Sequence, residues 1–376
     1  MDRRRFLQAV ATGSLVVAGG GLTTACQRLW PPGVAPDVYG PLAAPDANGL
    51  RLPAGFTSRV VATSGQVVAG TGFTWHGDPD GGACFRQPGG GWIYVSNAER
   101  VNGGASMLRF APDGTIVEAR TILSGTIANC AGGSTPWGTW LSCEERTYGR
   151  VWECDPTGVA PAAVRDPMGS FKHEAAACDP GRQVVYLTED QSDGALYRFT
   201  PTTWRDLSAG LLEVLTDVAG TLAWAPVPNP NPGLSDTPTR DQVANTRRFA
   251  GGEGIVVDGN GKAFFTTKGD NRVWLYDPAG PSLTIVYDDS TSPTPTLTGV
   301  DNITIDRTGL LYVAEDGGNL EIVCVGLEEQ AVPVVQLTGV TGSEITGPAF
   351  SPDGSRLYFS SQRNPGRTYE VTGPWR

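Results

Sequence analysis

Six stretches of the chain repeat one pattern of apolar and polar positions. A short apolar run leads into a turn with Gly, Asp or Pro, a second apolar run follows, and a polar or acidic cluster ends the unit. One aromatic residue marks each second run: Tyr94, Trp140, Tyr186, Phe264, Tyr312 and Tyr358. These markers are 46, 46, 78, 48 and 46 residues apart. A period in the mid-forties is typical of a four-stranded blade, so the pattern predicts an all-β fold, a six-bladed β-propeller. The alternative is an irregular β-sandwich with chance spacing.

The long interval between the third and fourth repeats indicates an insertion, roughly residues 202–249. Within it we expect a short helix over residues 203–215. The Pro-rich stretch 226–238 predicts a loop.

Each repeat is predicted to be a hairpin with polar residues at the start of its first strand and the end of its second. In an antiparallel hairpin these two ends lie side by side. If the hairpins are the inner strands of successive blades, their polar ends gather at one mouth of the central channel. The groups placed there are Glu174, Glu189, Asp190, Glu253, Lys268, Asp270, Asp301, Asn302, Glu315 and Asp316.

So many neighbouring carboxylates repel one another unless cations are present, and hard divalent cations prefer oxygen ligands. The chain contains only two histidines, His76 and His173, which excludes a His-rich zinc site. Cys130 lies in a turn before the second hairpin, and a thiolate among carboxylates would favour iron or another transition metal over calcium. The alternative is a buried or disulfide-bonded cysteine.

Composition agrees with many short strands, since the 376 residues include 50 Gly and 29 Pro. The formal net charge of −11 argues against a nucleic-acid partner, because phosphate backbones attract basic surfaces. An acidic surface can simply keep a protein soluble, but it is also what a multi-cation site needs. Nothing in the sequence points to oligomerisation, so we expect a monomer.

The N-terminus resembles a targeting segment. Paired arginines in Arg3-Arg4-Arg5-Phe6-Leu7 precede a mildly apolar stretch, which predicts a twin-arginine signal over residues 1–26 and export to the periplasm, the cell surface or the medium. Cys26 is a candidate lipid anchor, and it is the only membrane attachment we expect. Residues 27–53 are predicted to be a linker, and residues 54–376 a single propeller domain. Six later cysteines could form up to three disulfides in an oxidising compartment.

Five short segments resemble the PhoX-type alkaline phosphatases: residues 129–133, 135–140, 143–145, 172–175 and 188–190. The resemblance implies a six-bladed propeller with ferric and calcium ions at one channel mouth. It also implies hydrolysis of a small phosphorylated substrate, with a metal-bound oxygen attacking phosphorus. By this resemblance Cys130 and Glu174 would ligate iron. Glu144, Glu253 and other mouth carboxylates would hold iron or calcium, and Asn97 would contact the phosphate.

The chain departs from this family at one position. Where these phosphatases typically have Arg-Pro-Glu-Gly, residues 251–254 are Gly-Gly-Glu-Gly, so Glu253 is kept but an arginine expected to bind phosphate is replaced by Gly251. Lys268 and Arg272 are the candidate substitutes. Two other functions stay open: a calcium-dependent propeller hydrolase such as a lactonase, and a non-catalytic exported protein that binds metal or phosphate.

Overall fold

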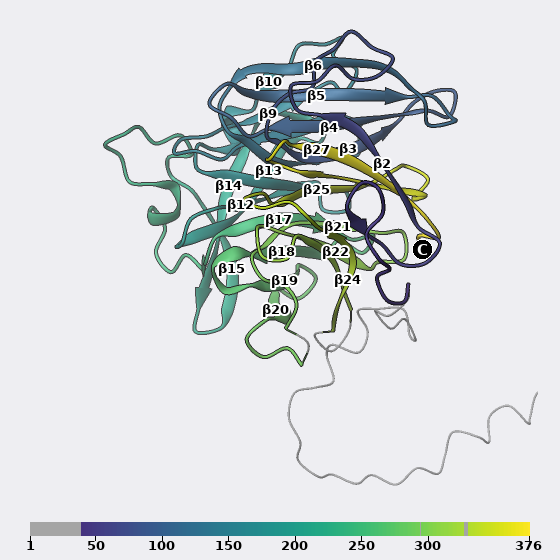
Figure 1. Ribbon diagram of the computed structural model, residues 1–376. Helices are drawn as coiled ribbons and strands as arrows, with labels where there is room; N and C mark the ends of the chain where they lie inside the picture. Colours follow the sequence, from purple (N-terminus) through teal and green to yellow (C-terminus); the bar gives the residue numbers. More distant parts are fainter. Residues whose placement is uncertain (1–38, 294, 327–329) are drawn as a thin grey trace, which may run out of the picture.

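Each of the six repeats folds into one antiparallel β-sheet, and the sheets follow one another around a central axis (Figure 1). This computed structural model describes residues 39–293, 295–326 and 330–376. The predicted six-bladed propeller is confirmed. Over the described residues no helix is long and apolar enough to span a membrane. The twin-arginine segment and Cys26 lie outside the described residues.

The blades are numbered in chain order, and each begins with its innermost strand. Blade 1 contains β3 (Pro79–Arg86), β4 (Trp92–Ala98), β5 (Gly103–Phe110) and β6 (Ile116–Thr126). Blade 2 contains β7 (Asn129–Ser134), β8 (Trp140–Glu144), β9 (Val151–Cys154) and β10 (Ala163–Val164). Blade 3 contains β11 (His173–Asp179), β12 (Val184–Glu189), β13 (Gly194–Thr203), β14 (Asp206–Val218) and β15 (Thr221–Pro226), with β16 (Arg248–Phe249) beside β13.

The second half of the ring follows the same plan. Blade 4 contains β17 (Gly252–Val257), β18 (Ala263–Thr267), β19 (Arg272–Asp277) and β20 (Ser282–Asp288). Blade 5 contains β21 (Val300–Ile305), β22 (Leu311–Glu315), β23 (Glu321–Val325) and β24 (Ala331–Leu337), with β1 (Leu50–Arg51) at its outer edge. Blade 6 contains β25 (Ile345–Phe350), β26 (Arg356–Ser361), β27 (Arg367–Thr372) and β2 (Thr57–Thr63).

Strands from the two ends of the described chain close the ring. The outermost strand of blade 6 is β2, which pairs with β27 (purple beside yellow in Figure 1). The segment expected to be a linker also takes part, because β1 pairs with β24 and both Leu50 and Leu52 are buried. The packed body therefore begins before residue 54, since these leucines bury apolar surface against blade 5.

The helix predicted over residues 203–215 is wrong. Residues Asp206–Val218 form β14, which pairs with β13 on one side and β15 on the other. Leu212 and Val214 are buried in the core of blade 3 by this pairing. Tertiary packing therefore decides the conformation of this segment over its local helix propensity. The Pro-rich segment after β15 forms a loop that ends in a short 3-10 turn, Thr239–Asp241.

The aromatic residues that marked the repeats all lie in second strands and are buried. Each is at most 4 % exposed. Tyr94 of blade 1 stacks on Tyr358 of blade 6 with ring centroids 5.0 Å apart, and Tyr186 of blade 3 meets Tyr276 of blade 4 at 5.8 Å. The markers therefore recur because neighbouring sheets pack through them.

The innermost strands approach one another so closely that some positions admit only glycine. A Cβ atom on Gly133 of β7 would lie 1.7 Å from the carbonyl oxygen of Ala176 in β11. We expect Gly133→Ala to lower the free energy of unfolding by about 3 kcal/mol or more, because backbone must move. Gly280→Ala is the matched control, because nothing lies within 4 Å of a Cβ there. Urea denaturation measures both, and equal midpoints would contradict the close approach.

Candidate metal centre

Each innermost strand carries a β-bulge at the same place, near the start of the strand. The register shifts follow Pro79, Asn129, His173, Gly252, Val300 and Thr346. A bulge leaves its extra residue out of the ladder and re-aims the side chain. The residues directly after these positions form what we call the inner set: Asp80, Cys130, Glu174, Glu253, Asp301 and Gly347. Five of the six are residue types that bind metal ions.

The second strand of each blade supplies a matching position. The residue before each bulge pairs with a residue on the second strand of the same blade. The residue that directly follows this partner in the sequence belongs to what we call the outer set. Its members are Glu99, Glu145, Asp190, Lys268, Asp316 and Ser361. The repeat therefore brings two polar sets to the same end of the channel.

Members of the two sets form three groups of potential ligands among the described residues. The first is Asp80, Glu99 and Cys130, the second is Cys130, Glu145 and Glu174, and the third is Glu174, Glu253 and Asp301. Within each triad the ligand atoms lie within 4.8 Å of one another. Because Cys130 and Glu174 each belong to two triads, the three groups form one continuous centre across blades 1 to 5.

Burial and mutual repulsion oppose ionisation of this centre when no cation is present. Burial, followed by the charge of Glu99, raises the pKa of Asp80, and burial followed by Glu253 raises the pKa of Glu174. Burial raises the pKa of Asp301 to about 6 and that of Glu145 to about 7. Such shifts mean that the charged forms lack compensation, which cations would supply.

Unpaired atoms in the centre also fit bound cations. Glu174 is fully buried, and its Oε2 has no hydrogen-bond partner among the described residues. Its Oε1 accepts a weak hydrogen bond from the Cys130 thiol at 3.3 Å and a long one from the Asn302 amide at 3.4 Å. Buried carboxylate oxygens are rarely left unsatisfied. Burial also raises the pKa of the Cys130 thiol, whereas a coordinated cation deprotonates a thiol.

Three predicted ligands, Glu144, Glu189 and Glu315, lie outside the triads. Each accepts a hydrogen bond from the backbone N–H six residues further on, over 3.1, 3.2 and 3.1 Å. Glu189 also forms an ion pair of 2.9 Å with Arg240 from the insertion. These carboxylates therefore hold the loops after β8, β12 and β22.

The physical reason is the alternation of side chains at a strand end. Each of these glutamates is followed by a second acid: Glu145, Asp190 or Asp316. Successive residues of a strand point to opposite sides, so the first acid of each pair meets its own loop and the second belongs to the outer set. Sequence reasoning chose the first acid and missed Glu145 as a ligand. It also missed Asp80 and Glu99 in blade 1, although the alternation could have identified them.

Asn97 does not lie where a phosphate could reach it. Its side chain is fully buried, and its Oδ1 accepts hydrogen bonds from Trp140 Nε1 at 2.9 Å and Ser142 Oγ at 2.8 Å. Its Nδ2 donates to the carbonyl oxygens of Cys130, at 3.0 Å, and Ala131, at 2.8 Å. All its hydrogen-bonding capacity is used, so Asn97 positions Cys130 instead of binding substrate.

Two threonines act in the same way further round the ring. Thr188 of blade 3 donates to the Glu253 carbonyl of blade 4 at 2.5 Å, and Thr266 of blade 4 donates to the Asp301 carbonyl of blade 5 at 2.5 Å. The second strand of one blade thus fixes the bulge of the next blade. Such support holds ligands in place before any ion binds.

The other predicted residues divide between the centre and its surroundings. Lys268 Nζ lies 3.1 Å from both Glu253 and Asp316, beside the third triad. Burial opposes the charge of Lys268, but Glu253 and Asp301 outweigh it and raise its pKa. Asn302 donates to Asp301 at 3.0 Å. Arg272 is paired with two aspartates, Asp270 and Asp288, away from the triads.

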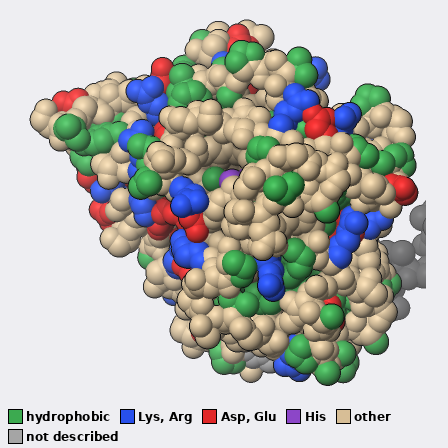
Figure 2. Space-filling model, turned by 45° about the horizontal axis from the view of Figure 1, so that its top comes forward, with side chains coloured by type: hydrophobic (Ala, Val, Ile, Leu, Met, Phe, Trp, Pro, Cys, Tyr) green, Lys and Arg blue, Asp and Glu red, His purple; other side chains and the backbone are tan. Residues whose placement is uncertain are grey.

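Acidic and basic side chains also form ion pairs near the surface. Figure 2 shows lysine or arginine together with aspartate or glutamate on one side of a hollow in which a histidine is visible. Lys172, for example, pairs at 2.7 Å with both Glu145 and Asp190. The six cysteines within the described residues are all free thiols, so the disulfides that we considered do not form between them.

Comparison with known proteins gives a family match over part of the chain and a fold. Residues 98–153 and 146–280 match the sequence profile described as alkaline phosphatase PhoX. The chain resembles the structure of Pseudomonas fluorescens PhoX in complex with vanadate, with a TM-score of 0.73 and 18% identity over 89% of this chain and 97% of that one. No curated protein sequence matches this chain.

Two further structures share the propeller at lower similarity. A Bacteroides thetaiotaomicron protein of unknown function gives a TM-score of 0.56 at 8% identity, over 84% of this chain and 76% of that one. A gluconolactonase from Xanthomonas campestris gives 0.53 at 12% identity, over 89% and 98%. At these identities the structural likenesses show the fold alone.

Proposed function

Because residues 98–280 match the family model of alkaline phosphatase PhoX, we propose that this chain is a metal-dependent phosphoester hydrolase of that type. The observation that carries the proposal is the continuous centre of three triads joined by Cys130 and Glu174. Burying several carboxylates side by side costs free energy when no cation is present, as their raised pKa values indicate. Bound cations would offset that cost by attracting the charged carboxylates.

The donor atoms suggest which cations the centre takes. Cys130 belongs to the first two triads, and thiolate ligands favour a transition metal, so we assign ferric iron there. The third triad offers only carboxylate oxygens, which suit calcium. When bound, such cations polarise a phosphoryl group and neutralise the charge that develops on its oxygens.

The residues of the chain prepare this centre. Asn97, Thr188 and Thr266 fix the backbone of three inner-set residues, so the ligands need little reorganisation when cations bind. Lys268 supplies a positive charge beside the third triad, where it can attract an anionic substrate. Gly251 has φ of +73°, a backbone conformation that favours glycine, and it brings no guanidinium to the mouth.

We also propose that the protein works outside the cytoplasm after export by the twin-arginine route. The Arg3-Arg4-Arg5-Phe6-Leu7 segment supports this, because paired arginines before an apolar stretch are typical of a twin-arginine signal. That route carries proteins that are already folded. Export in the folded state would let the cations bind before transport. The free thiols agree with a fold that does not depend on oxidation.

The test is turnover by purified protein loaded with iron and calcium, with calcium alone, or stripped with a chelator. We expect p-nitrophenyl phosphate and simple phosphomonoesters to be hydrolysed by the protein loaded with both metals, and at least about a hundredfold more slowly after stripping. Failure on all phosphomonoesters and diesters would overturn the proposal. Lactone hydrolysis with calcium alone would favour the lactonase alternative, and tight phosphate binding without turnover would indicate a binding protein.

A further inference from the structure

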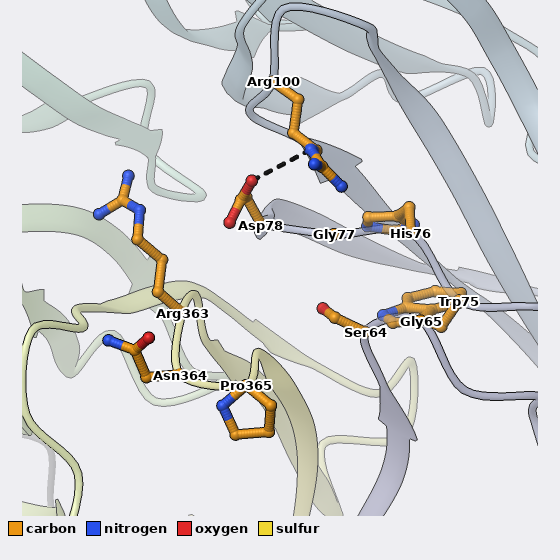
Figure 3. Close-up of a pocket in the computed structure, with 10 residues that line it drawn as sticks. All are labelled: Ser64, Gly65, Trp75, His76, Gly77, Asp78, Arg100, Arg363, Asn364 and Pro365. Carbon is orange, nitrogen blue, oxygen red and sulfur yellow. Dashed lines mark ion pairs between the residues drawn. The ribbon is translucent and has the colours of Figure 1, made fainter.

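A pocket of about 570 Å³ opens between blade 1 and blade 6, and we call it the rim pocket. It is lined by residues 64–65 and 75–78, by Arg100, and by residues 363–365. Figure 3 shows Asp78 between Arg100 and Arg363, with His76 on the adjoining wall. The pocket is thus built from three loops that meet at the seam where the ring closes.

The rim pocket adjoins the metal centre. Arg363 Nη2 lies 3.3 Å from Glu99 Oε2, and Glu99 belongs to the first triad. The amide of Gln362 donates to Glu99 at 2.8 Å and also to Asp80, the other carboxylate of that triad. Arg100 directly follows Glu99 in the chain. A substrate with its phosphoryl group at the first triad would therefore extend into the rim pocket.

Two arginines supply the positive charge among the side chains that line the rim pocket. Its side chains include two guanidinium groups and one carboxylate, that of Asp78. His76 adds no charge, because burial lowers its pKa to about 3. Arg363 is 45% exposed but pairs with two carboxylates, Glu99 at 3.3 Å and Glu344 at 2.6 Å. Lys172 and Lys268 are 28% and 36% exposed and also pair with two carboxylates each. Arg100 is 53% exposed and pairs with Asp78. Arg100 is therefore the most accessible of these cations.

Gly77 and Asp78 lie directly against the guanidinium of Arg100. Arg100 pairs with Asp78 through Nε at 3.2 Å, and no other carboxylate forms an ion pair with it among the described residues. The guanidinium lies against the backbone of Gly77, where a Cβ atom would be 2.2 Å from Nη1. Asp78 has φ of +46°, a costly conformation for a residue other than glycine. Glycine at 77 and the unusual backbone at 78 together hold the guanidinium in place.

We propose that the rim pocket binds a second anionic group of the substrate, next to the phosphoryl group at the first triad. The protein then prefers phosphoesters whose alcohol part carries a carboxylate or another phosphate, because the guanidinium fork matches the oxygens of both. This inference rests on the proposed phosphoester hydrolase function, and it adds the class of substrate.

Two matched pairs of substrates test it with the metal-loaded protein. 3-Phosphoglycerate carries a carboxylate that glycerol 3-phosphate lacks, and glucose 1,6-bisphosphate carries a phosphate that glucose 6-phosphate lacks. We expect kcat/KM to be about tenfold higher for the anionic member of at least one pair. The pair that shows the preference identifies the anion. Ratios near one for both pairs would overturn the proposal.

Variants tie the preference to the pocket. Arg100→Gln should bring the ratio close to one, and Gly77→Ala should lower it by displacing the guanidinium without removing its charge. Arg109→Gln is the matched control, because Arg109 lies on β5, is 46% exposed and, among the residues that the structure describes, pairs with Glu118 alone. A ratio unchanged in both pocket variants, or lowered equally in the control, would overturn the assignment.

Binding separates this inference from the proposed function. Calorimetry compares the affinities of 3-phosphoglycerate and glycerol 3-phosphate, and of the two glucose phosphates, for the wild type and Arg100→Gln. If no phosphoester is hydrolysed but one anionic member binds about tenfold tighter, the hydrolase proposal fails and the rim pocket stands. If turnover occurs without any preference in rate or affinity, the hydrolase proposal stands and the proposal that the rim pocket binds a second anionic group is wrong.

Discussion

Replacing Glu174 with glutamine is expected to remove more than one metal ion and to lower kcat/KM for p-nitrophenyl phosphate by roughly a thousandfold. Glu174 is shared by the second and third triads, so its carboxylate serves two cation sites at once. Glutamine keeps the size of the side chain but loses the charge that holds the cations. Elemental analysis of the purified protein and steady-state kinetics measure the two effects.

The fold of this variant should survive. Glu174 is buried with an unpaired oxygen, and burial raises its pKa, so a neutral amide costs the metal-free protein little. Glu213→Gln is the control, because Glu213 is also buried and pairs with Arg198 on the outer part of blade 3, away from the triads. Full metal content and wild-type activity in Glu174→Gln would show that the triads do not hold the catalytic cations.

The metal-free protein should become less stable as the pH rises from about 5 to 8, with a fall in Tm of roughly 5–10 °C. Burial raises the pKa of Asp301 to about 6, of Glu145 to about 7 and of Glu344 to about 9. Between the unfolded and folded pKa values, the folded protein keeps protons that the unfolded chain has released. Stability therefore falls with rising pH in this window, the reverse of an ordinary ion-paired carboxylate.

Loading with iron and calcium should invert the trend. Cations bind the deprotonated ligands and only the folded state assembles them, so bound metal stabilises the protein more at pH 8 than at pH 5. Thermal melts with and without metal at both pH values test the sign. Glu145→Gln should flatten the slope of the metal-free protein, since it removes one of the shifted groups. A metal-free protein that gains stability towards pH 8 would contradict the strained centre.

The repeat pattern was enough to predict the propeller and the gathering of acids at one mouth. Strand alternation and turn residues are local properties, and buried marker aromatics such as Tyr94 and Tyr186 recur where neighbouring blades pack together. Glu174, Glu253 and Asp301 were placed together for the same reason, since each begins an inner strand. Cys130, which was expected in a turn before the second hairpin, also lies in an inner strand, β7.

Local pattern was not enough wherever two neighbouring residues were chemically alike. Glu144 and Glu145 are the same amino acid, yet one binds a loop and the other faces Cys130. The choice depends on the strand register and on the bulge, which are set by contacts with the adjacent blade. Asn97 likewise looked available for substrate until Trp140 and Ser142 were seen to use its oxygen.

The sequence by itself determined the number of blades, the hairpins and the chemistry of the mouth, because these follow from period, turn composition and residue type. Tertiary structure alone decided which acids join the centre, that β14 is a strand, and that β2 closes the ring beside β27. It also decided that Arg100 and Arg363, 263 positions apart, line one pocket beside the first triad. Those features depend on contacts between distant segments, and ring closure brings such segments together.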